Sequence, residues 1–100
     1  MMEYRDMRAT EEEIERTERA NGSDIYIRFM ANGITPVAYE NSAVFLNRCF
    51  PQYPVVQTRD DAGSREYRMV AGFSLEEVLE RFAACQIWVD DFSVRIQNVF

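Results

Sequence analysis

The chain has 100 residues, of which 47% are hydrophobic and 13% aromatic, enough for one domain with a packed core and too many for a wholly disordered chain. Seventeen acidic against eleven basic residues, all of the latter arginine, leave a net charge of −6. This balance disfavours unaided binding to a phosphate backbone, because such affinity comes from neutralising phosphates. The absence of histidine removes the commonest general base and most zinc and iron sites, so we expect no metal and no cofactor.

Location and redox state follow from two further absences. No run of residues approaches the roughly 18 consecutive apolar residues that a membrane helix needs, and the N-terminus Met-Met-Glu-Tyr-Arg-Asp lacks the basic-then-apolar order of a signal peptide. We therefore expect a cytoplasmic protein without a membrane partner. Cys49 and Cys85 fall inside apolar helical patterns and are expected to be small buried hydrophobes rather than a disulfide.

Residues 1–23 are expected to form a charged N-terminal extension that contains one helix. Thr10 and Glu13 have the spacing of a capping box, and Asn21-Gly22 is a C-terminal stop signal, which together predict a helix over about residues 11–20. This helix has little apolar surface, so we expect it to lie on the surface or to fray. Its charges are interpreted as a solvated face in preference to an interaction tail.

Residues 24–100 are expected to form the folded domain, which begins with extended chain. Alternating apolar residues over 25–30 predict a strand, and Asn32-Gly33 is typical of a two-residue type I′ turn. A second extended segment, residues 35–39, contains Pro36, which favours an edge strand or the start of a strand. The two segments are expected either to pair as a hairpin or to form one long strand interrupted at the turn.

After these segments the sequence alternates between helices and hairpins. Asn41 or Ser42 is expected to cap a helix that Pro51 ends, and Ser74 with Glu77 is a second capping box, which begins a helix that extends to about residue 82. The remaining predicted strands are 55–59, 66–71, 86–89 and 92–99, with turn chemistry at 60–63. The order α-ββ-α-ββ-α-ββ predicts an α+β domain, in which two to three helices pack on a mixed sheet of five to six strands.

Two adjacent carboxylate pairs are the candidates for catalytic or metal chemistry. Asp60-Asp61 and Asp90-Asp91 have the composition to hold a divalent ion or to share acid–base work, but both occupy turn positions where aspartate is favoured for backbone bonding alone. Turn formation is the preferred interpretation. The sequence has no glycine-rich phosphate loop, nucleophile elbow or metal-ligand cluster, so we predict that the protein is not an enzyme.

Arginines on the predicted strands are the candidate ligand-facing residues, and Tyr26, Tyr67 and Trp88 lie close to them in the pattern. Arginines interleaved with aromatic residues on a sheet can grip phosphates and stack bases. The alternative is an ordinary solvent-facing sheet whose arginines pair with Glu66 and its neighbours, and the net charge favours this alternative. The candidate arginines are Arg28, Arg59, Arg65, Arg68 and Arg95.

A series of short matches to a known family runs through residues 10–98. Its members are Ile25–Met30, Gly33, Tyr39–Ala43, Thr58–Asp61, Met69–Phe73, Leu75–Phe82 and Phe92–Ile96. The series resembles the N-terminal, mismatch-recognition domain of MutS-type DNA repair proteins. In that family a leading helix is followed by an apolar strand, a glycine, a Phe-Tyr-Glu element, an acidic-Ala helix start, a hairpin ending in Met-Ala-Gly, a helix and closing strands. The resemblance implies a mixed-sheet fold.

The Phe-Tyr-Glu element that reads the mismatch in that family is missing from this sequence. The family's phenylalanine wedges beside a mispaired base and its glutamate bonds that base, whereas the corresponding positions here are Ile34 and Pro36. Isoleucine can wedge between bases as other apolar side chains do, but proline cannot supply a carboxylate. The resemblance therefore implies the fold without mismatch reading, and Ile34 becomes a sixth candidate ligand-facing residue.

Together these observations predict a stand-alone, non-catalytic binding or regulatory domain, with nucleic acid as its candidate partner. The alternative is an acidic protein-interaction module, such as an inhibitor or immunity-type protein, whose first helix offers carboxylates to a basic target. An enzyme is disfavoured because no base, nucleophile or cofactor loop is recognisable. The sequence specifies neither the ligand nor the oligomeric state.

Overall fold

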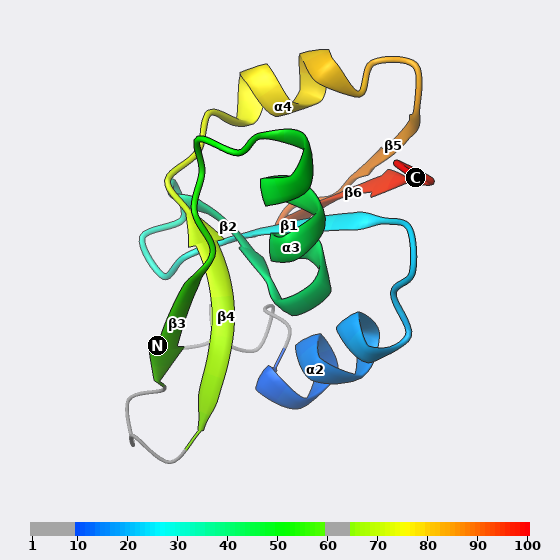
Figure 1. The fold of residues 1–100 in the computed structure, drawn as a ribbon. Coiled ribbons are helices and arrows are strands. Elements are labelled where there is room, and N and C mark those ends of the chain that lie inside the picture. Colours follow the sequence, from blue (N-terminus) through cyan, green and yellow to red (C-terminus); the bar gives the residue numbers. More distant parts are fainter. Residues whose placement is uncertain (1–9, 60–64) are drawn as a thin grey trace.

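The computed structural model describes residues 10–59 and 65–100, which form three helices and a six-stranded sheet (Figure 1). The elements are α2 (Glu11–Arg19), β1 (Ile25–Phe29), β2 (Pro36–Tyr39), α3 (Glu40–Cys49), β3 (Val56–Arg59), β4 (Glu66–Ala71), α4 (Leu75–Arg81), β5 (Gln86–Val89) and β6 (Ser93–Gln97). The expected α+β class and the order of elements are confirmed. The turn predicted at residues 60–63 lies outside the described residues.

The strands lie in the order β3-β4-β2-β1-β6-β5, and all five neighbouring pairs are antiparallel. The sheet is therefore more uniform than the mixture of strand directions that the sequence suggests. Two helical crossovers, from β2 through α3 to β3 and from β4 through α4 to β5, join strands that run in the same direction. These strands never lie side by side, because β4 separates β2 from β3 and three strands separate β4 from β5.

Strands β1 and β2 form the hairpin that was one of the two expected arrangements. The connection is longer than the predicted two-residue turn, because the outermost backbone bond joins Met30 N–H to the Thr35 carbonyl (2.9 Å). The Asn32 side chain accepts from the N–H groups of Ile34 and Thr35 at 2.8 and 2.9 Å, which stabilises this wider loop. Pro36 is the first residue of β2, as its missing N–H predicts.

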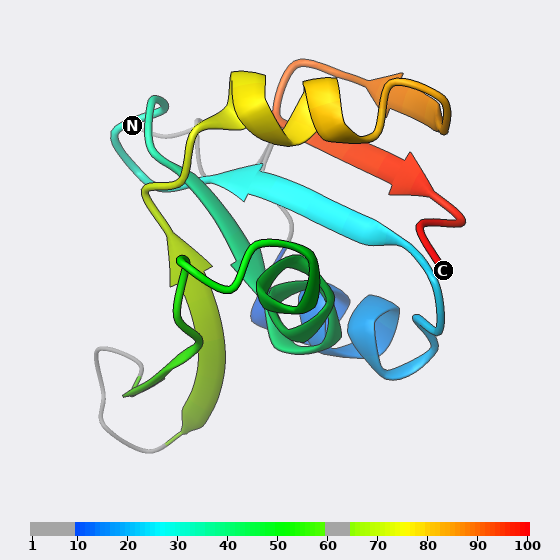
Figure 2. The same cartoon turned by 45° about the horizontal axis from the view of Figure 1, so that its top comes forward.

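Helix α3 packs on β1, β2 and β4, and α4 covers the same face of the sheet beside it (Figures 1 and 2). The alternation predicted for β1 holds, because Ile25 and Ile27 are fully buried under the helices. Cys49 and Cys85 are both free, as predicted, but they are only partly buried at the margin of the core, and Cys85 lies beyond the end of α4 rather than within a helix. The core consists of Ile25, Ile27, Ala38, Ala43, Leu46, Phe50, Val70, Phe73, Val78, Phe82, Val94 and Ile96.

Helix α3 begins two to three residues earlier than predicted, because its N-cap residue is Tyr39 rather than Asn41 or Ser42, and its own sequence does not cap it. Its N-cap residue, Tyr39, makes no side-chain capping bond. The cap comes instead from Glu18 of α2, whose carboxylate accepts from the Ser42 N–H at 2.8 Å and from the Ser42 hydroxyl at 2.6 Å. A carboxylate at this position satisfies an unpaired backbone donor and complements the positive end of the helix dipole.

Glu18 is only 2% exposed and belongs to a polar network that joins three elements. Asn21 donates to the Glu18 carboxylate at 3.2 Å and to the Asp24 carbonyl at 2.7 Å, while the Ser42 hydroxyl accepts from the Tyr26 N–H of β1 at 2.9 Å. Burial raises the pKa of Glu18, and the hydrogen bonds from Ser42 and Asn21 offset this only in part. Most of α2 is exposed, as predicted, but a buried polar group holds it in place rather than an apolar face.

Replacing Glu18 with alanine should lower the free energy of unfolding by about 3 kcal/mol, because the N–H and hydroxyl donors of Ser42 are then buried without their acceptor. Chemical denaturation of the wild type and the variant, followed by circular dichroism, measures this loss. Glu12→Ala is the matched control, since Glu12 lies on the exposed side of the same helix and its loss should leave stability unchanged. Equal stabilities for the two variants would contradict the assigned role of Glu18.

Candidate binding face

The structure separates the six candidate ligand-facing residues into different regions. Ile34 lies in the β1–β2 loop and is 78% exposed. Arg59 forms an ion pair across the β3–β4 hairpin with Glu66 (2.7 Å), and Arg68 of β4 pairs with Glu40 at the start of α3 (3.1 Å). These two arginines therefore connect neighbouring elements of the fold.

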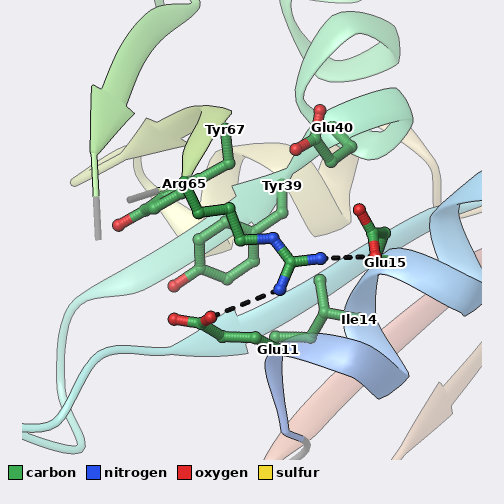
Figure 3. A pocket seen from close by; sticks show the side chains of 7 residues that line it. All are labelled: Glu11, Ile14, Glu15, Tyr39, Glu40, Arg65 and Tyr67. Carbon is green, nitrogen blue, oxygen red and sulfur yellow. Dashed lines mark hydrogen bonds and ion pairs between the residues drawn. The ribbon is translucent and has the colours of Figure 1, made fainter. Parts of the chain in front are cut away.

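Arg65 lies in a pocket of about 90 Å³ between α2 and the sheet (Figure 3). Its guanidinium points between two carboxylates of α2 and forms ion pairs with Glu15 and, at 3.5 Å, with Glu11. The hydrogen bond from Arg65 holds the pKa of Glu15 below its usual range. Pockets that bind small molecules usually measure about 300–1,000 Å³. This small pocket, already crossed by an arginine, is best described as the attachment of α2 to β4.

The two remaining arginines meet on the face of the sheet opposite the helices. Tyr26 and Arg28 alternate with the buried residues of β1, so their side chains point away from the core. Arg95 of β6 lies directly opposite Tyr26, and Trp88 of β5 lies directly opposite Arg95. Tyr26, Arg28, Trp88 and Arg95 are named here the open-face cluster.

Cation–π contacts organise this cluster. The Arg95 guanidinium lies 5.3 Å from the centre of the Tyr26 ring, and that of Arg28 lies 6.0 Å from the same ring, within the range in which the ring attracts a cation. Trp88 is 53% exposed, and its indole N–H donates to the Gln97 side chain at 2.7 Å. A row of tyrosine, arginine and tryptophan therefore crosses three adjacent strands.

The two arginines of the cluster differ in their electrostatic partners. Arg95 donates to the Asp24 carboxylate at 2.8 and 3.0 Å, and the Asn98 N–H donates to the same carboxylate at 2.9 Å. Burial raises the pKa of Asp24, but these hydrogen bonds outweigh it and the pKa lies below its ordinary value. Arg28 makes no ion pair with any residue of 10–59 or 65–100.

Of the two carboxylate pairs, the structure describes Asp90-Asp91. It lies in a turn, as the preferred interpretation of the sequence predicted. Asp90 accepts from the N–H groups of Phe92 and Ser93, both at 2.7 Å, and the first of these bonds lowers its pKa. The pair Asp60-Asp61 lies outside the described residues. Within the described ranges, no group of three or more cysteine, aspartate or glutamate side chains has the arrangement to hold a metal ion.

Comparison with known proteins gives no relative for this chain. No family model matches it, and no curated protein or solved structure is significantly similar. The resemblance to the MutS N-terminal domain therefore stays a prediction. Among the described residues, no helix is long and apolar enough to span a membrane.

The row across β1, β6 and β5 was not found from the sequence, although each of its residues was noted there. Alternation along one strand shows which side chains share a face, but it does not show which strands are neighbours. The pairing of β1 with the last strand, which joins Tyr26 to Arg95 69 residues later, is set by tertiary packing. The link between Asp24 and Arg95 follows from that pairing.

Asp24→Asn should lower stability at neutral pH by about 1 kcal/mol, because it removes the charge from the bond to Arg95. A lowered folded pKa means that this contribution is present above the ordinary pKa of 3.8 and is lost as pH falls through the folded value. Denaturation midpoints of wild type and variant should therefore converge in acid.

Glu18→Gln is the control, because its effect on stability should depend on pH in the opposite direction. The folded pKa of Glu18 is raised above 4.5, so the wild type gains stability relative to this variant as pH falls from neutral towards 4.5. A pH-independent difference between Asp24→Asn and the wild type would contradict the assigned charge of Asp24.

Proposed function

We propose that this chain is a non-catalytic binding domain that recognises a protein partner through the open-face cluster. The observation that carries the proposal is the row of Tyr26, Arg95 and Trp88 across three strands, with Arg28 beside it. Tyrosine, tryptophan and arginine are the side chains most enriched among the residues that dominate binding energy at protein interfaces. A sheet holds them in fixed positions, which lowers the entropy lost on binding.

The charges of the cluster support a protein partner in preference to a nucleic acid. Binding to a phosphate backbone gains affinity with each phosphate that a cation neutralises. Arg95 is already paired with Asp24, which leaves Arg28 as the cation of the cluster without an ion pair to residues 10–59 or 65–100. We infer a partner that offers one carboxylate to Arg28 and apolar or aromatic surface to Tyr26 and Trp88.

The acidic-module alternative relies on the carboxylates of α2, and most of these have roles within the fold. Glu18 is buried as the cap of α3, Glu11 and Glu15 pair with Arg65, and Glu13 completes the capping box with Thr10. Before α2 could present these carboxylates to a basic target, each glutamate would have to break its bond within the fold or accept from a second donor at the same oxygen. Removing residues 1–23 to test the alternative would also remove the cap of α3.

Single substitutions in the cluster should weaken partner binding without unfolding the domain. Arg28→Gln removes the charge while keeping most of the length, and Tyr26→Leu removes the aromatic ring while keeping an apolar side chain. We expect each to weaken the affinity for the partner by roughly 30-fold, the loss of about 2 kcal/mol that defines a dominant interface residue.

The measurement is affinity capture from nuclease-treated native lysate, followed by titration of the captured protein against each variant. Arg59→Gln is the matched control, because Arg59 is exposed and lies on β3 at the opposite edge of the sheet, and it should bind like the wild type. A partner that binds wild type, Arg28→Gln and Tyr26→Leu equally would place the interface elsewhere on the molecule.

Single-stranded nucleic acid is a second candidate ligand, which the spacing of the two aromatic residues favours. Tyr26 and Trp88 lie on strands separated by one other strand, about 10 Å apart at the usual strand spacing. Exposed rings on a sheet can stack successive bases, and Arg28 would contact one phosphate. This candidate and the protein partner use the same face.

Trp88 is the only tryptophan in the chain, so its fluorescence reports directly on stacking. If the second candidate is right, a single-stranded oligonucleotide should quench the emission at low salt. Its affinity should fall with salt at a slope of about −0.7, as for one phosphate contact, and Arg28→Gln should abolish this slope. Unchanged emission at low salt, for DNA and RNA alike, would remove this candidate.

A further inference from the structure

Strand β5 forms one border of the sheet and has a paired strand on one side only, among the described residues (Figure 2). Its inner neighbour is β6, in the register Gln86 to Gln97 through Val89 to Val94. A strand at such a border presents backbone N–H and C=O groups that can pair with another chain.

The hydrogen-bonding pattern shows which backbone groups of β5 point outward. Asp90 N–H donates to the Ser93 carbonyl at 3.0 Å, so these two residues form a hydrogen-bonded pair of the antiparallel ladder. Such pairs alternate along a strand, and Trp88 therefore also directs its backbone groups towards β6. Ile87 and Val89 direct theirs to the free edge.

This edge lacks the features that usually prevent sheets from pairing. Natural edge strands are protected by charged side chains, proline or a bulge, whereas β5 reads Gln-Ile-Trp-Val and pairs with β6 without a bulge. The other border strand, β3, ends in the charged residue Arg59. Along β5, Val89 is 70% exposed and Trp88 is 53% exposed. The unprotected edge is therefore also the more apolar one.

We propose that β5 pairs with β5 of a second copy of this chain, in an antiparallel arrangement centred on Trp88. This register places Ile87 opposite Val89 of the second copy, and the symmetry repeats the pair on the other side of the centre. Both residues direct their backbone groups outward, so each pair exchanges two hydrogen bonds. Every residue then meets a side chain on its own face of the joined sheet.

The side chains match in this register. The two Trp88 rings lie together on the open face, while Ile87 and Val89 meet on the helix-covered face, where Ile87 already packs against the core. Asp90 lies opposite Gln86 of the second copy, whose side chain is a neutral amide. No two carboxylates of the paired strands therefore face each other. The self-complementarity of residues 86–90 is the reason to assign a second copy as the occupant.

The size of the edge sets the strength of the dimer. Exposed side-chain surface at Trp88 and Val89 amounts to roughly 200 Å² per copy, if a tryptophan presents about 200 Å² and a valine somewhat less. The total is well below the roughly 1,200 Å² of a stable interface. Each copy also carries a charge of −6, and salt screens the resulting repulsion. We therefore expect a weak, reversible dimer that salt strengthens.

Val89→Pro tests the backbone pairing between the two copies of β5. It removes the outward N–H of residue 89 while leaving the bonds between β5 and β6 in place. Val89→Thr is the matched control, since it keeps the N–H and a β-branched side chain. Sedimentation velocity over a wide range of protein concentrations should show a monomer–dimer equilibrium for the wild type and for Val89→Thr. It should show only monomer for Val89→Pro. Raising the salt concentration should shift the wild type further towards dimer.

Two further variants separate loss of dimerisation from misfolding and from loss of partner binding. Val89→Lys places a charge at the edge and should also give monomer, which matters if circular dichroism shows that Val89→Pro does not fold. Arg28→Gln should dimerise like the wild type, so loss of partner binding through the open face and loss of dimerisation are distinguishable. A wild type that stays monomeric at the highest concentration and salt, or a folded Val89→Lys that still dimerises, would overturn the proposal.

Discussion

The buried carboxylate of Glu18 is the interaction on which the arrangement of the first half of the chain depends. The chain passes from β2 to α3 without a loop, and Glu40 at this junction has a φ of 48°, in the left-handed region that non-glycine residues seldom adopt. Tyr39, the residue before this helix, belongs to β2 and makes no side-chain bond to the first N–H groups of the helix. Glu18 supplies that cap from α2, and Ser42 links the same site to β1.

Burying a carboxylate is costly unless hydrogen bonds satisfy it, and the described residues offer Glu18 neutral donors rather than a salt bridge. The helix dipole adds to these donors, because the carboxylate lies at the positive end of α3. The raised pKa of Glu18 shows that the compensation is incomplete. The same site also fixes where α2 lies, and thereby positions Glu15 to hold Arg65 of the β3–β4 hairpin.

Much of the fold follows from local sequence signals, whereas the candidate binding face does not. Thr10 forms its predicted capping box, and Ser74 caps α4 as predicted, because each bond lies within four residues. The other half of the box predicted at Ser74 is replaced by Tyr53, whose hydroxyl accepts from the Ser74 N–H and donates to Glu77. The cap of α3 could not be predicted in this way, because its donor and acceptor are 24 residues apart. The order of the strands is likewise a property of tertiary packing. Residues on the open face were recognised singly, and only the order β1-β6-β5 makes them a row.

The distribution of charge explains why an acidic chain leaves arginine and aromatic residues on one face. Its arginines on β3, β4 and the approach to β4 are paired with glutamates of the same chain, so their positive charges are balanced within the fold. Arg95 is likewise neutralised by Asp24, yet its guanidinium still lies over Tyr26. The open face therefore combines low net charge with two aromatic rings and the guanidinium of Arg28. This combination suits the fully desolvated centre of a protein interface better than the highly charged surface of a nucleic acid.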